Sequence, residues 1–397
     1  MALEINRLKV LNLATNKPGK LTYSVIKFHR GDNSLLSLKH IIKEAIFQAS
    51  KTFVMKLISY IKEGHEQLAM LVDDIVYDTD TLNPELPSTM SMFLNYWEDY
   101  MPLAQAINTS IIEGKVSINK GFPIDSALLL PPVPQASSCR VGYAFSDYAK
   151  AFMRNYKMEL STAFEQFPAF YFSNHHSLVG PGPVSCLPDH LEKLDFELQV
   201  AVVICKQGRN IPASEADEYI GGYMIMNGIT ARQLQKEEVA LNLGQAKGND
   251  FARVTGPWLV TPDELQSFLT EAKTNHVGHT YNLSMKCWVN GALVSEGNMA
   301  DMDWTFAEII ERSSYGADIY PGDIISSGAV GTGCFQEING HGLMDAPEYQ
   351  EQWLQPGDTV TLEIDGLGTL TSSIVAEESS FSLLALKKAP AVFNPDK

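Results

Sequence analysis

The segment Leu194-Asp-Phe-Glu-Leu-Gln-Val-Ala-Val-Val-Ile204 alternates polar and apolar side chains before it becomes wholly apolar. Successive side chains of a β-strand point to opposite faces, so Asp195, Glu197 and Gln199 share one face and apolar residues take the other. An apolar face is what a strand packed on a core requires. The three polar side chains therefore predict either a wet surface or the lining of a polar cavity.

Downstream of this strand, an apolar run ends at Gly228 and a helix is predicted to follow. Thr230 and Gln233 have the spacing of a capping box, in which each residue satisfies a backbone N–H at the start of a helix. Arg232 and Gln235 are three residues apart and should lie on one side of the first turns. The same arrangement is common on plain helix surfaces.

Two glycine-rich loops follow. Residues 244–251 bring Lys247 and Asp250 into one loop, and the segment Gly328-Ala-Val-Gly-Thr-Gly-Cys-Phe-Gln-Glu337 contains three closely spaced glycines. Glycine lets a backbone approach its neighbour closely, because it carries no Cβ. Either loop could line a site or serve only as a turn.

The composition is typical of a globular protein, with 45% hydrophobic and 19% charged residues. Thirty Lys and Arg residues face 47 Asp and Glu residues, which gives a formal charge of -17. This field repels polyanions, so nucleic acid is excluded as an expected partner. Five cysteines form no C-x-x-C pair, which predicts a reducing, cytoplasmic setting and no zinc cage.

The apolar stretch from Ile41 to Ile61 is interrupted by four charged residues. It predicts an amphipathic helix that packs on a core, or alternatively one that lies on a membrane surface, and it does not predict a membrane span. No membrane partner is expected.

Two domains are predicted, residues 1–125 and 126–397, because the proline-rich stretch 128–134 is typical of a boundary. Beyond it, short runs rich in Val, Ile, Phe and Tyr are bounded by Pro-Gly and Gly-Pro turns. No βαβ rhythm or phosphate-binding glycine loop is present. The expected fold class is α+β and mostly β, rolled or barrel-like.

Together these segments resemble the fumarylacetoacetate hydrolase superfamily, in its longer bacterial type with an N-terminal domain. The resemblance rests on the motifs D-F-E-L, M-N-x-x-x-A-R-x-x-Q, G-x-A-K-G-x-D-F and W-L-Q-P-G-D, which occur in order between about Leu128 and Val375. It implies a β-roll domain behind a smaller N-terminal domain, and a homodimer.

The resemblance also implies a divalent cation, magnesium or calcium, held by four acidic side chains beside a catalytic histidine. Of those metal ligands only Glu197 is retained; Gln199, Gly228 and Val141 stand at the other three positions. Tyr148 stands at the position of the histidine and is a poor base at pH 7. No cofactor is therefore expected, with magnesium or calcium bound only if the family site survives.

Other pocket positions match the family's residue types. The retained positions, which line the substrate in the family, are Tyr143, Tyr171, Arg232, Gln235, Lys247 and Glu337, and Arg154 is a further expected substrate contact. Without the family's base and metal, catalysis is expected to fall to Tyr148, Lys247, Glu337 and bound water. Lys247 and Arg232 lack the acids that balance them in the family pattern, and an unpaired buried cation is costly. This favours binding of a small carboxylate.

The favoured interpretation is a divergent enzyme that acts on a 2-oxo or 1,3-dicarbonyl carboxylic acid without the family's magnesium site. The reaction would be hydrolysis of a C–C bond in a ketonic substance, or related lyase chemistry. One alternative is a non-catalytic binding or scaffold protein, and another is an ordinary metal-dependent hydrolase with misplaced ligands. A third is a rebuilt metal site in which His175 or His176 joins Glu197 and Asp195.

Overall fold

The computed structural model describes residues 14–15, 21–22, 55–155, 157–241, 246–346 and 348–388. Met1–Lys51 and Thr52–Lys397 form separate compact units. In the first unit, β1 (Ala14–Thr15) pairs antiparallel with β2 (Leu21–Thr22).

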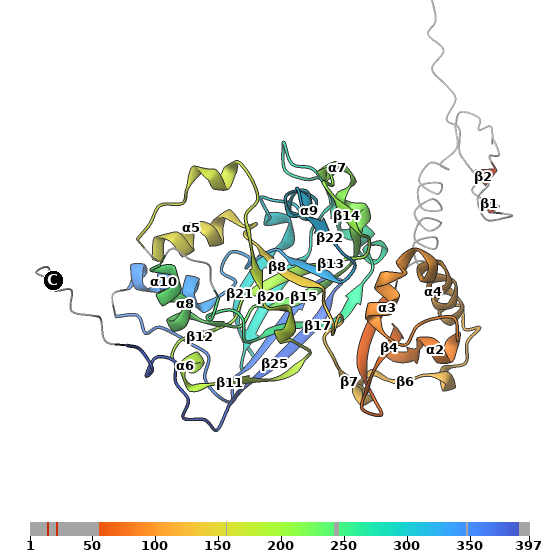
Figure 1. Ribbon diagram of the computed structural model, residues 1–397, viewed down its shortest axis with the longest axis horizontal. Coiled ribbons are helices and arrows are strands. Elements are labelled where there is room, and N and C mark those ends of the chain that lie inside the picture. Colours follow the sequence, from red (N-terminus) through yellow and green to blue (C-terminus); the bar gives the residue numbers. More distant parts are fainter. Residues whose placement is uncertain are drawn as a thin grey trace, which may run out of the picture. The chain divides into compact units, whose positions relative to one another are not determined.

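A long mixed sheet runs through the second unit in the order β6-β5-β4-β3-β17-β15-β13-β23-β8-β9 (Figure 1). The strands are β6 (Phe122–Pro123), β5 (Ile75–Asp78), β4 (His65–Val72), β3 (Lys56–Lys62), β17 (Arg253–Val260), β15 (Ile220–Asn227), β13 (Leu198–Ile204), β23 (Asp323–Ser326), β8 (Ser138–Gly142) and β9 (Phe170–Ser173). Most neighbours are antiparallel, and β23 and β8 are parallel. Two short strands join the sheet: β10 (Leu178–Val179) pairs with β17, and β7 (Leu128–Leu129) pairs with β3.

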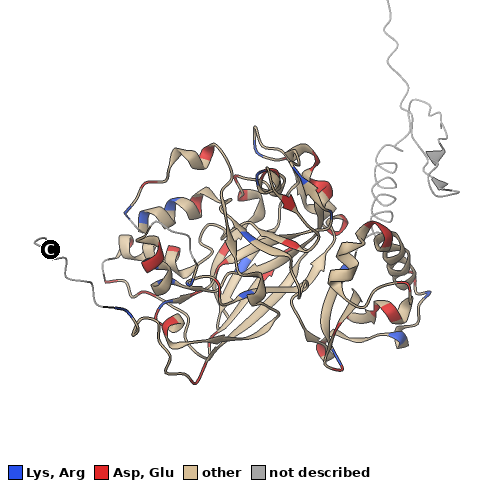
Figure 2. Cartoon of the chain, in the orientation of Figure 1, with Lys and Arg blue, Asp and Glu red and all other residues tan. Residues whose placement is uncertain are grey.

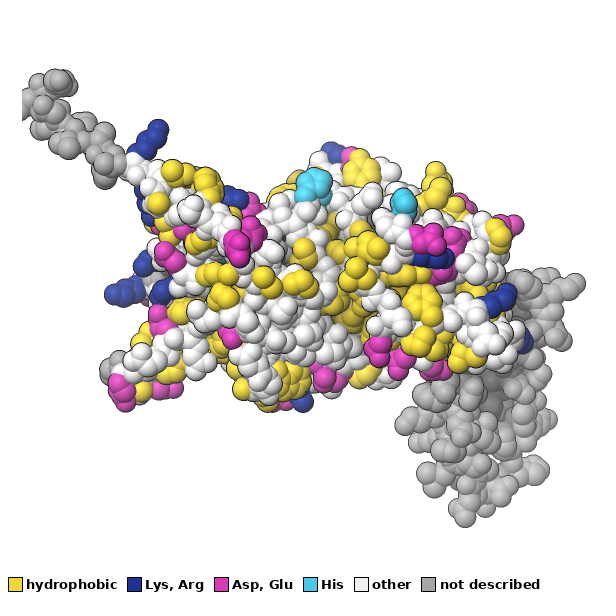
Figure 3. Space-filling view, turned by 90° about the horizontal axis from the view of Figure 1, so that it is seen from below, with side chains coloured by type: hydrophobic (Ala, Val, Ile, Leu, Met, Phe, Trp, Pro, Cys, Tyr) yellow, Lys and Arg dark blue, Asp and Glu magenta, His cyan; other side chains and the backbone are white. Residues whose placement is uncertain are grey.

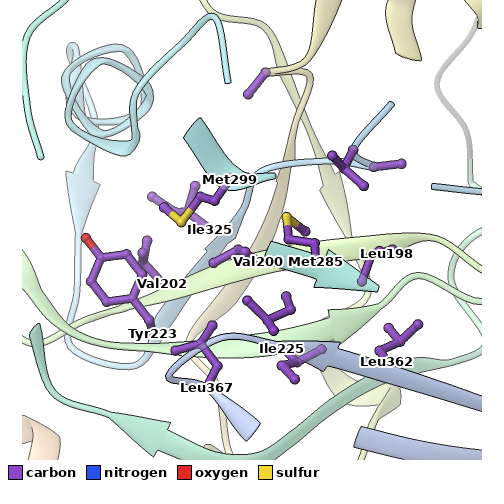
Figure 4. Packing of buried hydrophobic residues seen from close by; sticks show 14 of the residues in the cluster. Leu198, Val200, Val202, Tyr223, Ile225, Met285, Met299, Ile325, Leu362 and Leu367 are labelled. Atoms are coloured by element: carbon purple, nitrogen blue, oxygen red, sulfur yellow. The ribbon is translucent and has the colours of Figure 1, made fainter. Parts of the chain in front are cut away.

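A second sheet has the order β11-β25-β24-β20-β21. Its strands are β11 (Gly182–Cys186), β25 (Gly368–Ala376), β24 (Thr359–Ile364), β20 (Ser284–Val289) and β21 (Ala292–Asn298). Its apolar face packs on that of the long sheet, and Figure 4 shows Leu198, Val200 and Ile225 facing Met285 and Leu362 in this core. The predicted class, α+β with mostly β structure, is confirmed.

Strand β13, which contains most of the segment 194–204, is buried on both faces. The alternate residues Leu198, Val200 and Val202 belong to the core between the sheets. Ala201 and Val203 pack instead in a second cluster, with α3 (Met90–Asn95) and α4 (Trp97–Ile112). A strand covered on both faces requires the continuous apolar run that follows Gln199.

Asp195 and Glu197 of the same segment lie before β13, and Gln199 is its second residue. Leu194–Asp195 forms β12, which pairs with β16 (Thr230–Ala231), and Phe196 and Glu197 lie between β12 and β13. Of the two predicted environments, a wet surface is wrong, because Asp195, Glu197 and Gln199 are all buried.

The helices nearest to Glu197 gather beside β12. Figure 1 shows α5 (Ser146–Asn155), α8 (Arg232–Val239) and α10 (Phe335–Asp345) together at this end of the sheets. The remaining helices are α2 (Thr79–Leu82), α6 (Pro188–Leu191), α7 (Ala213–Ala216) and α9 (Phe306–Ser314). The predicted capping box is wrong: the helix begins at Arg232 after Ala231, and the Thr230 hydroxyl donates to the Gly228 carbonyl at 3.0 Å.

Two predictions concern the start of the described region. A helix was expected over residues 41–61, and its part up to residue 54 lies outside the described residues. For the remaining part the prediction is wrong, because Lys56–Lys62 forms β3. β3 pairs with β17 at Leu57 and Leu259, so residues 55–125 continue the long sheet. The domain boundary at residue 125 stays a prediction.

The surface carries mixed charge. Figure 2 shows acidic and basic residues interspersed over the described elements, and Figure 3 shows hydrophobic side chains lying between charged ones on one face. No helix in the described ranges is long and apolar enough to cross a bilayer. All five cysteines are buried and free. The cytoplasmic setting and the homodimer stay predictions.

Replacing Ile225 by alanine should lower the free energy of unfolding by about 2–5 kcal/mol, because the side chain is fully buried between the sheets. Urea unfolding monitored by circular dichroism measures this loss. The matched control is Leu293→Ala on β21, where the side chain is 51% exposed and the cost should stay within about 0.5 kcal/mol. Equal losses in both variants would contradict the placement of the core.

Candidate active site

Glu197 lies at the centre of a closed polar cluster. Its Oε1 atom accepts a hydrogen bond from the Tyr148 hydroxyl at 3.1 Å and lies 3.0 Å from Arg232 Nη2. Its Oε2 atom accepts from Gln199 Nε2 at 2.7 Å. Gln199 Oε1 in turn accepts from the Ser326 hydroxyl at 2.7 Å. Both carboxylate oxygens are therefore already engaged by protein donors.

Arg232, the first residue of α8, connects Glu197 to a second acid. Its Nε donates to Asp195 Oδ2 at 2.8 Å, and Nη1 donates to Gln235 Oε1 at 3.1 Å. Burial acts to lower the pKa of Arg232, but the two carboxylates outweigh it and raise that pKa well above its usual value. The predicted placement of Arg232 and Gln235 on one side of the helix is confirmed.

Asp195 also accepts from the first turn of α10. The backbone N–H groups of Phe335 and Gln336 donate to its carboxylate at 2.7 and 3.0 Å. A helix N-terminus has unpaired N–H groups and a partial positive charge, so an acid is stabilised there. Asp195 thus links α10 to α8.

The two cations that the sequence left unbalanced are in fact balanced. Arg232 pairs with Asp195 and Glu197, and Lys247 Nζ lies 2.9 Å from Asp250 Oδ2. The argument that unpaired basic residues call for an anionic ligand was wrong for both. The balancing acids lie within the family motifs themselves. Asp250 is three residues from Lys247, whereas Asp195 and Glu197 are far from Arg232 along the chain.

The cluster extends through amides to β9 and β17. Gln235 Nε2 donates to Asn249 Oδ1 at 3.3 Å, and Asn249 Nδ2 donates to the Tyr171 hydroxyl oxygen at 3.2 Å. The same oxygen accepts from Arg253 Nη2 at 3.3 Å. Burial raises the pKa of Tyr171 to about 12, so it stays protonated. A continuous hydrogen-bonded chain therefore joins Arg232 to Arg253.

Tyr148 is a donor in this arrangement. It lies on the inner face of α5, and burial, followed by the Glu197 charge, raises its pKa well above the usual value near 10. Tyr143 packs edge-on against Tyr148 and Phe152, and its hydroxyl donates to the Ala149 carbonyl at 3.4 Å. Burial likewise raises the pKa of Tyr143. Both phenols are neutral at pH 7.

The outer face of α5 borders a cavity of about 460 Å³. Lys150 and Arg154 lie four residues apart on this face and line the cavity together with Glu337 of α10. Residues four apart share a helix face, and Tyr148 and Phe152 are related in the same way on the buried face. The helix thus separates the cavity from the Glu197 cluster.

Glu337 is one of several titratable groups at this cavity, which Asp147, Glu296, Asp301 and His341 also line. Burial raises its pKa to about 7, although the Thr332 N–H, which donates to Oε2 at 2.7 Å, acts to lower it. A carboxyl group with this pKa exchanges its proton readily near neutral pH. The charge of Asp147 raises the pKa of Glu337, and that of Arg154 lowers it.

Lys247 lies elsewhere. It lines a separate cavity of about 360 Å³ with His190 and Asp250. The structure therefore brings Tyr148, Tyr171, Arg232 and Gln235 together around Glu197, places Glu337 and Arg154 at one cavity, and puts Lys247 at another. The catalytic and substrate-binding roles given to these residues stay predictions.

Few side chains near Glu197 are suited to a metal ion. Gln199 offers its amide nitrogen to Glu197, Gly228 offers no side chain, and Val141 is a buried apolar residue of β8. His175 and His176 stack on each other with ring centroids 4.1 Å apart. Within the described ranges, no group of three or more His, Cys, Asp or Glu side chains could hold a metal ion.

The sequence reading missed Arg253 and Asn249. Arg253 is the first residue of β17, and it is fully buried. A basic residue between Ala252 and the apolar Val254 was the available signal. Asn249 lies in the same glycine-rich loop as Lys247. An asparagine is common in loops, so its residue type gave no signal of a role in the site.

Residues 138–375, more than half of the chain, match the family model described as fumarylacetoacetate (FAA) hydrolase C-terminal. The chain belongs to the fumarylacetoacetate hydrolase family. The resemblance inferred from the sequence motifs is confirmed.

Individual members of the fumarylacetoacetate hydrolase family match over most of their length. The fumarylacetoacetate hydrolase domain-containing protein 2 homolog of Dictyostelium discoideum is 24% identical over 331 residues, covering 81% of this chain and 97% of the relative. A mitochondrial oxaloacetate tautomerase of Rattus norvegicus is 26% identical over 319 residues, covering 80% and 89%.

A solved structure gives the same fold. The maleylpyruvate hydrolase from Sphingobium sp. SYK-6, in complex with manganese(II) ion and pyruvate, has a TM-score of 0.58 at 19% identity and covers 82% of this chain and 100% of its own. The predicted fumarylacetoacetate hydrolase fold is therefore confirmed. The manganese and pyruvate are properties of that enzyme.

Replacing Asp195 by alanine should lower the free energy of unfolding by about 3–5 kcal/mol, because it leaves the buried Arg232 with one carboxylate fewer. Chemical denaturation of the purified variant measures the change. The matched control is Asp318→Ala, which removes an exposed ion pair to Arg209 and should cost at most about 1 kcal/mol. A loss below 1 kcal/mol for Asp195→Ala would show that the cluster is not closed.

Glu337 should make stability depend on pH. Its folded pKa of about 7 lies above the ordinary value of 4.5, so the folded chain holds a proton that the unfolded chain releases between these values. Its contribution to stability is therefore present below about pH 4.5 and lost as pH rises through 7.

As the pH rises from 4.5 to 8, the unsubstituted protein should consequently lose stability relative to Glu337→Gln. The difference between their free energies of unfolding should shift by up to about 3 kcal/mol in favour of the variant. Denaturant titrations at both pH values measure this difference. The control is Glu296→Gln, which alters a 61% exposed carboxyl lining the same cavity. A pH-independent difference for Glu337→Gln would contradict the raised pKa.

Proposed function

We propose that this protein is an enzyme that moves protons on a small 2-oxo or 1,3-dicarbonyl carboxylic acid in the cavity beside α5, without the divalent cation of its family. The observation that carries the proposal is Glu337, a buried carboxyl with a pKa of about 7 at the wall of a cavity that also holds Arg154 and Lys150. A general acid or base works best when its pKa lies near the working pH.

The chemistry follows from the substrate class. In an oxo acid, the carbon next to the carbonyl loses and regains a proton during keto–enol exchange, and C–C cleavage between two carbonyls leaves an enolate that must be protonated. A carboxyl that is half ionised near neutral pH serves either step. The guanidinium of Arg154 and the ammonium of Lys150 supply positive charge for a substrate carboxylate.

The cavity is mixed in charge. Asp147, Glu296 and Asp301 also line it, so a substrate with several carboxylates would meet repulsion as well as attraction. This favours a small acid whose carboxylate reaches the basic side chains of α5. A cavity of about 460 Å³ suits a molecule of that size.

The relatives supply the first substrate to test. The rat protein that is 26% identical over most of both chains is an oxaloacetate tautomerase. Tautomerisation of oxaloacetate needs proton transfer and no bond cleavage, and the Glu337 carboxyl is suited to that step. We therefore favour keto–enol exchange of a small dicarboxylic oxo acid over C–C hydrolysis as the reaction of this protein.

The test is the decay of enol absorbance of oxaloacetate, with acylpyruvates as substrates for cleavage. Glu337→Gln should lower kcat by about 100-fold or more, because general acid–base catalysis typically contributes 10²–10⁴-fold. Activity of the unsubstituted protein should change with an apparent pKa near 7. Glu296→Gln should retain kcat within about threefold, since its carboxyl is 61% exposed and has no proton-transfer role in the proposal.

Undiminished kcat in Glu337→Gln would refute the assigned role. Absence of turnover with every oxo acid tried would favour the non-catalytic binding protein. Release of pyruvate from an acylpyruvate, without enol exchange of oxaloacetate, would move the reaction to C–C hydrolysis.

A further inference from the structure

The space beside Gly228 is occupied by other residues. A Cβ atom built on this glycine would lie 2.7 Å from Arg253 Nη1, 2.8 Å from Gln199 Nε2 and 3.0 Å from Glu197 Oε2. Two of these distances are below 3.0 Å, so a side chain at this position would displace the ends of the Arg253 and Gln199 side chains. A guanidinium, an amide and a carboxylate therefore converge where an acidic side chain would begin in the family pattern.

Arg253 reaches this place from β17 and is held on its other side. Its Nε donates to the Ser173 hydroxyl at 3.1 Å, and Nη2 donates to the Tyr171 hydroxyl oxygen at 3.3 Å. Its Nη1 atom points to Gly228 and has no hydrogen-bond partner among the described residues. A buried donor without a partner costs about 1–3 kcal/mol, which marks the position as one where an oxygen can bind.

The buried charges of this centre are balanced without a metal ion. Arg232 and Arg253 carry two positive charges, and Asp195 and Glu197 carry two negative ones; all four are at least 97% buried. A divalent cation would add two positive charges next to two guanidinium groups. Desolvated like charges repel strongly in an interior of low dielectric, so the residues present do not fit such an ion.

The ligand atoms of Glu197 lead to the same conclusion. Two hydrogen-bond donors, from Tyr148 and Gln199, and the ion pair with Arg232 already engage its two oxygens. A magnesium or manganese ion requires several oxygen ligands at about 2.0–2.2 Å, and the amide nitrogen of Gln199 points at the carboxylate instead. Binding a metal would require at least one of these donors to leave.

We propose that the guanidinium of Arg253 is the resident cation of this centre, taking the place of the family's divalent metal, and that Nη1 donates to the oxygen of a buried water. Nη1 is enclosed with the Glu197 cluster and does not line the cavity in which the proposed function places the oxo acid. The metal part of the proposal is independent of any activity. Gly228 makes room for the guanidinium, and Gln199 avoids a second acid beside Glu197.

The first measurement is manganese binding to the full chain after treatment with a chelator and desalting, followed by electron paramagnetic resonance of free Mn²⁺. We expect no stoichiometric site up to millimolar concentration. One Mn²⁺ per chain that disappears in Glu197→Gln would overturn the proposal. The Glu197→Gln control separates this centre from weak binding to the acidic surface.

The second measurement rebuilds the family's acids. The triple variant Gly228→Asp, Gln199→Glu, Arg253→Ala places three acids together and removes the guanidinium, so stoichiometric Mn²⁺ binding should appear. The matched control is the double variant Gly228→Asp, Gln199→Glu, which keeps Arg253 and should bind at least 10-fold more weakly. Equal affinity in the two variants, or no binding by a folded triple variant, would overturn the proposal.

A third measurement tests the proposal without the triple variant, in case that variant does not fold. Arg253→Lys keeps the positive charge and Arg253→Met keeps the length of the side chain without it. The melting temperature of Arg253→Lys should stay several degrees above that of Arg253→Met. A melting temperature of Arg253→Met equal to or above that of Arg253→Lys would show that the charge is not needed. A lack of turnover would contradict the proposed function and leave these results unaffected.

Discussion

Neutralisation of buried charge is the constraint on which this end of the molecule depends. Glu197, Asp195 and Arg232 are removed from water, so each must be paired and hydrogen-bonded or the fold would lose several kcal/mol. The pairing fixes where α8 begins and where α10 begins, because Arg232 is the first residue of one helix and Asp195 accepts from the first turn of the other. The two sheets supply the rigid support on which these helices are held.

The helix α5 divides one expected pocket into two environments. Its buried face carries Tyr148 onto Glu197, in a closed cluster where the phenol of Tyr148 stays neutral and acts as a donor. Its outer face carries Arg154 toward a cavity in which a single carboxyl, Glu337, has a pKa near 7. In the proposed function, proton transfer and charge pairing therefore lie on different sides of one helix, whereas a metal-dependent site would combine them.

Much of the fold and part of the site could be predicted from local patterns. The alternation along residues 194–204 and the motif order identified the family, and the spacing of Arg232 and Gln235 gave their contact correctly. The capping box at Thr230 failed because that residue is held in β16, where strand pairing outweighs local helix signals. The partners of Arg232 were missed because Asp195 and Glu197 are distant in the sequence and meet it only in space. The pair of Lys247 with Asp250, three residues on, was open to prediction from spacing and was not predicted.

By itself, the sequence determined the family, the mostly β class and the identity of the side chains at the family's motif positions, because these depend on short-range periodicity and on residue type. Only the tertiary structure decided that Arg253 fills the space beside Gly228, that Lys247 lies apart from Glu337, and that α5 separates a closed cluster from an open cavity. The physical reason is that burial and electrostatic pairing are set by segments far apart in the chain. Arg253 and Glu197 are 56 positions apart, and their proximity follows from the pairing of β13, β15 and β17.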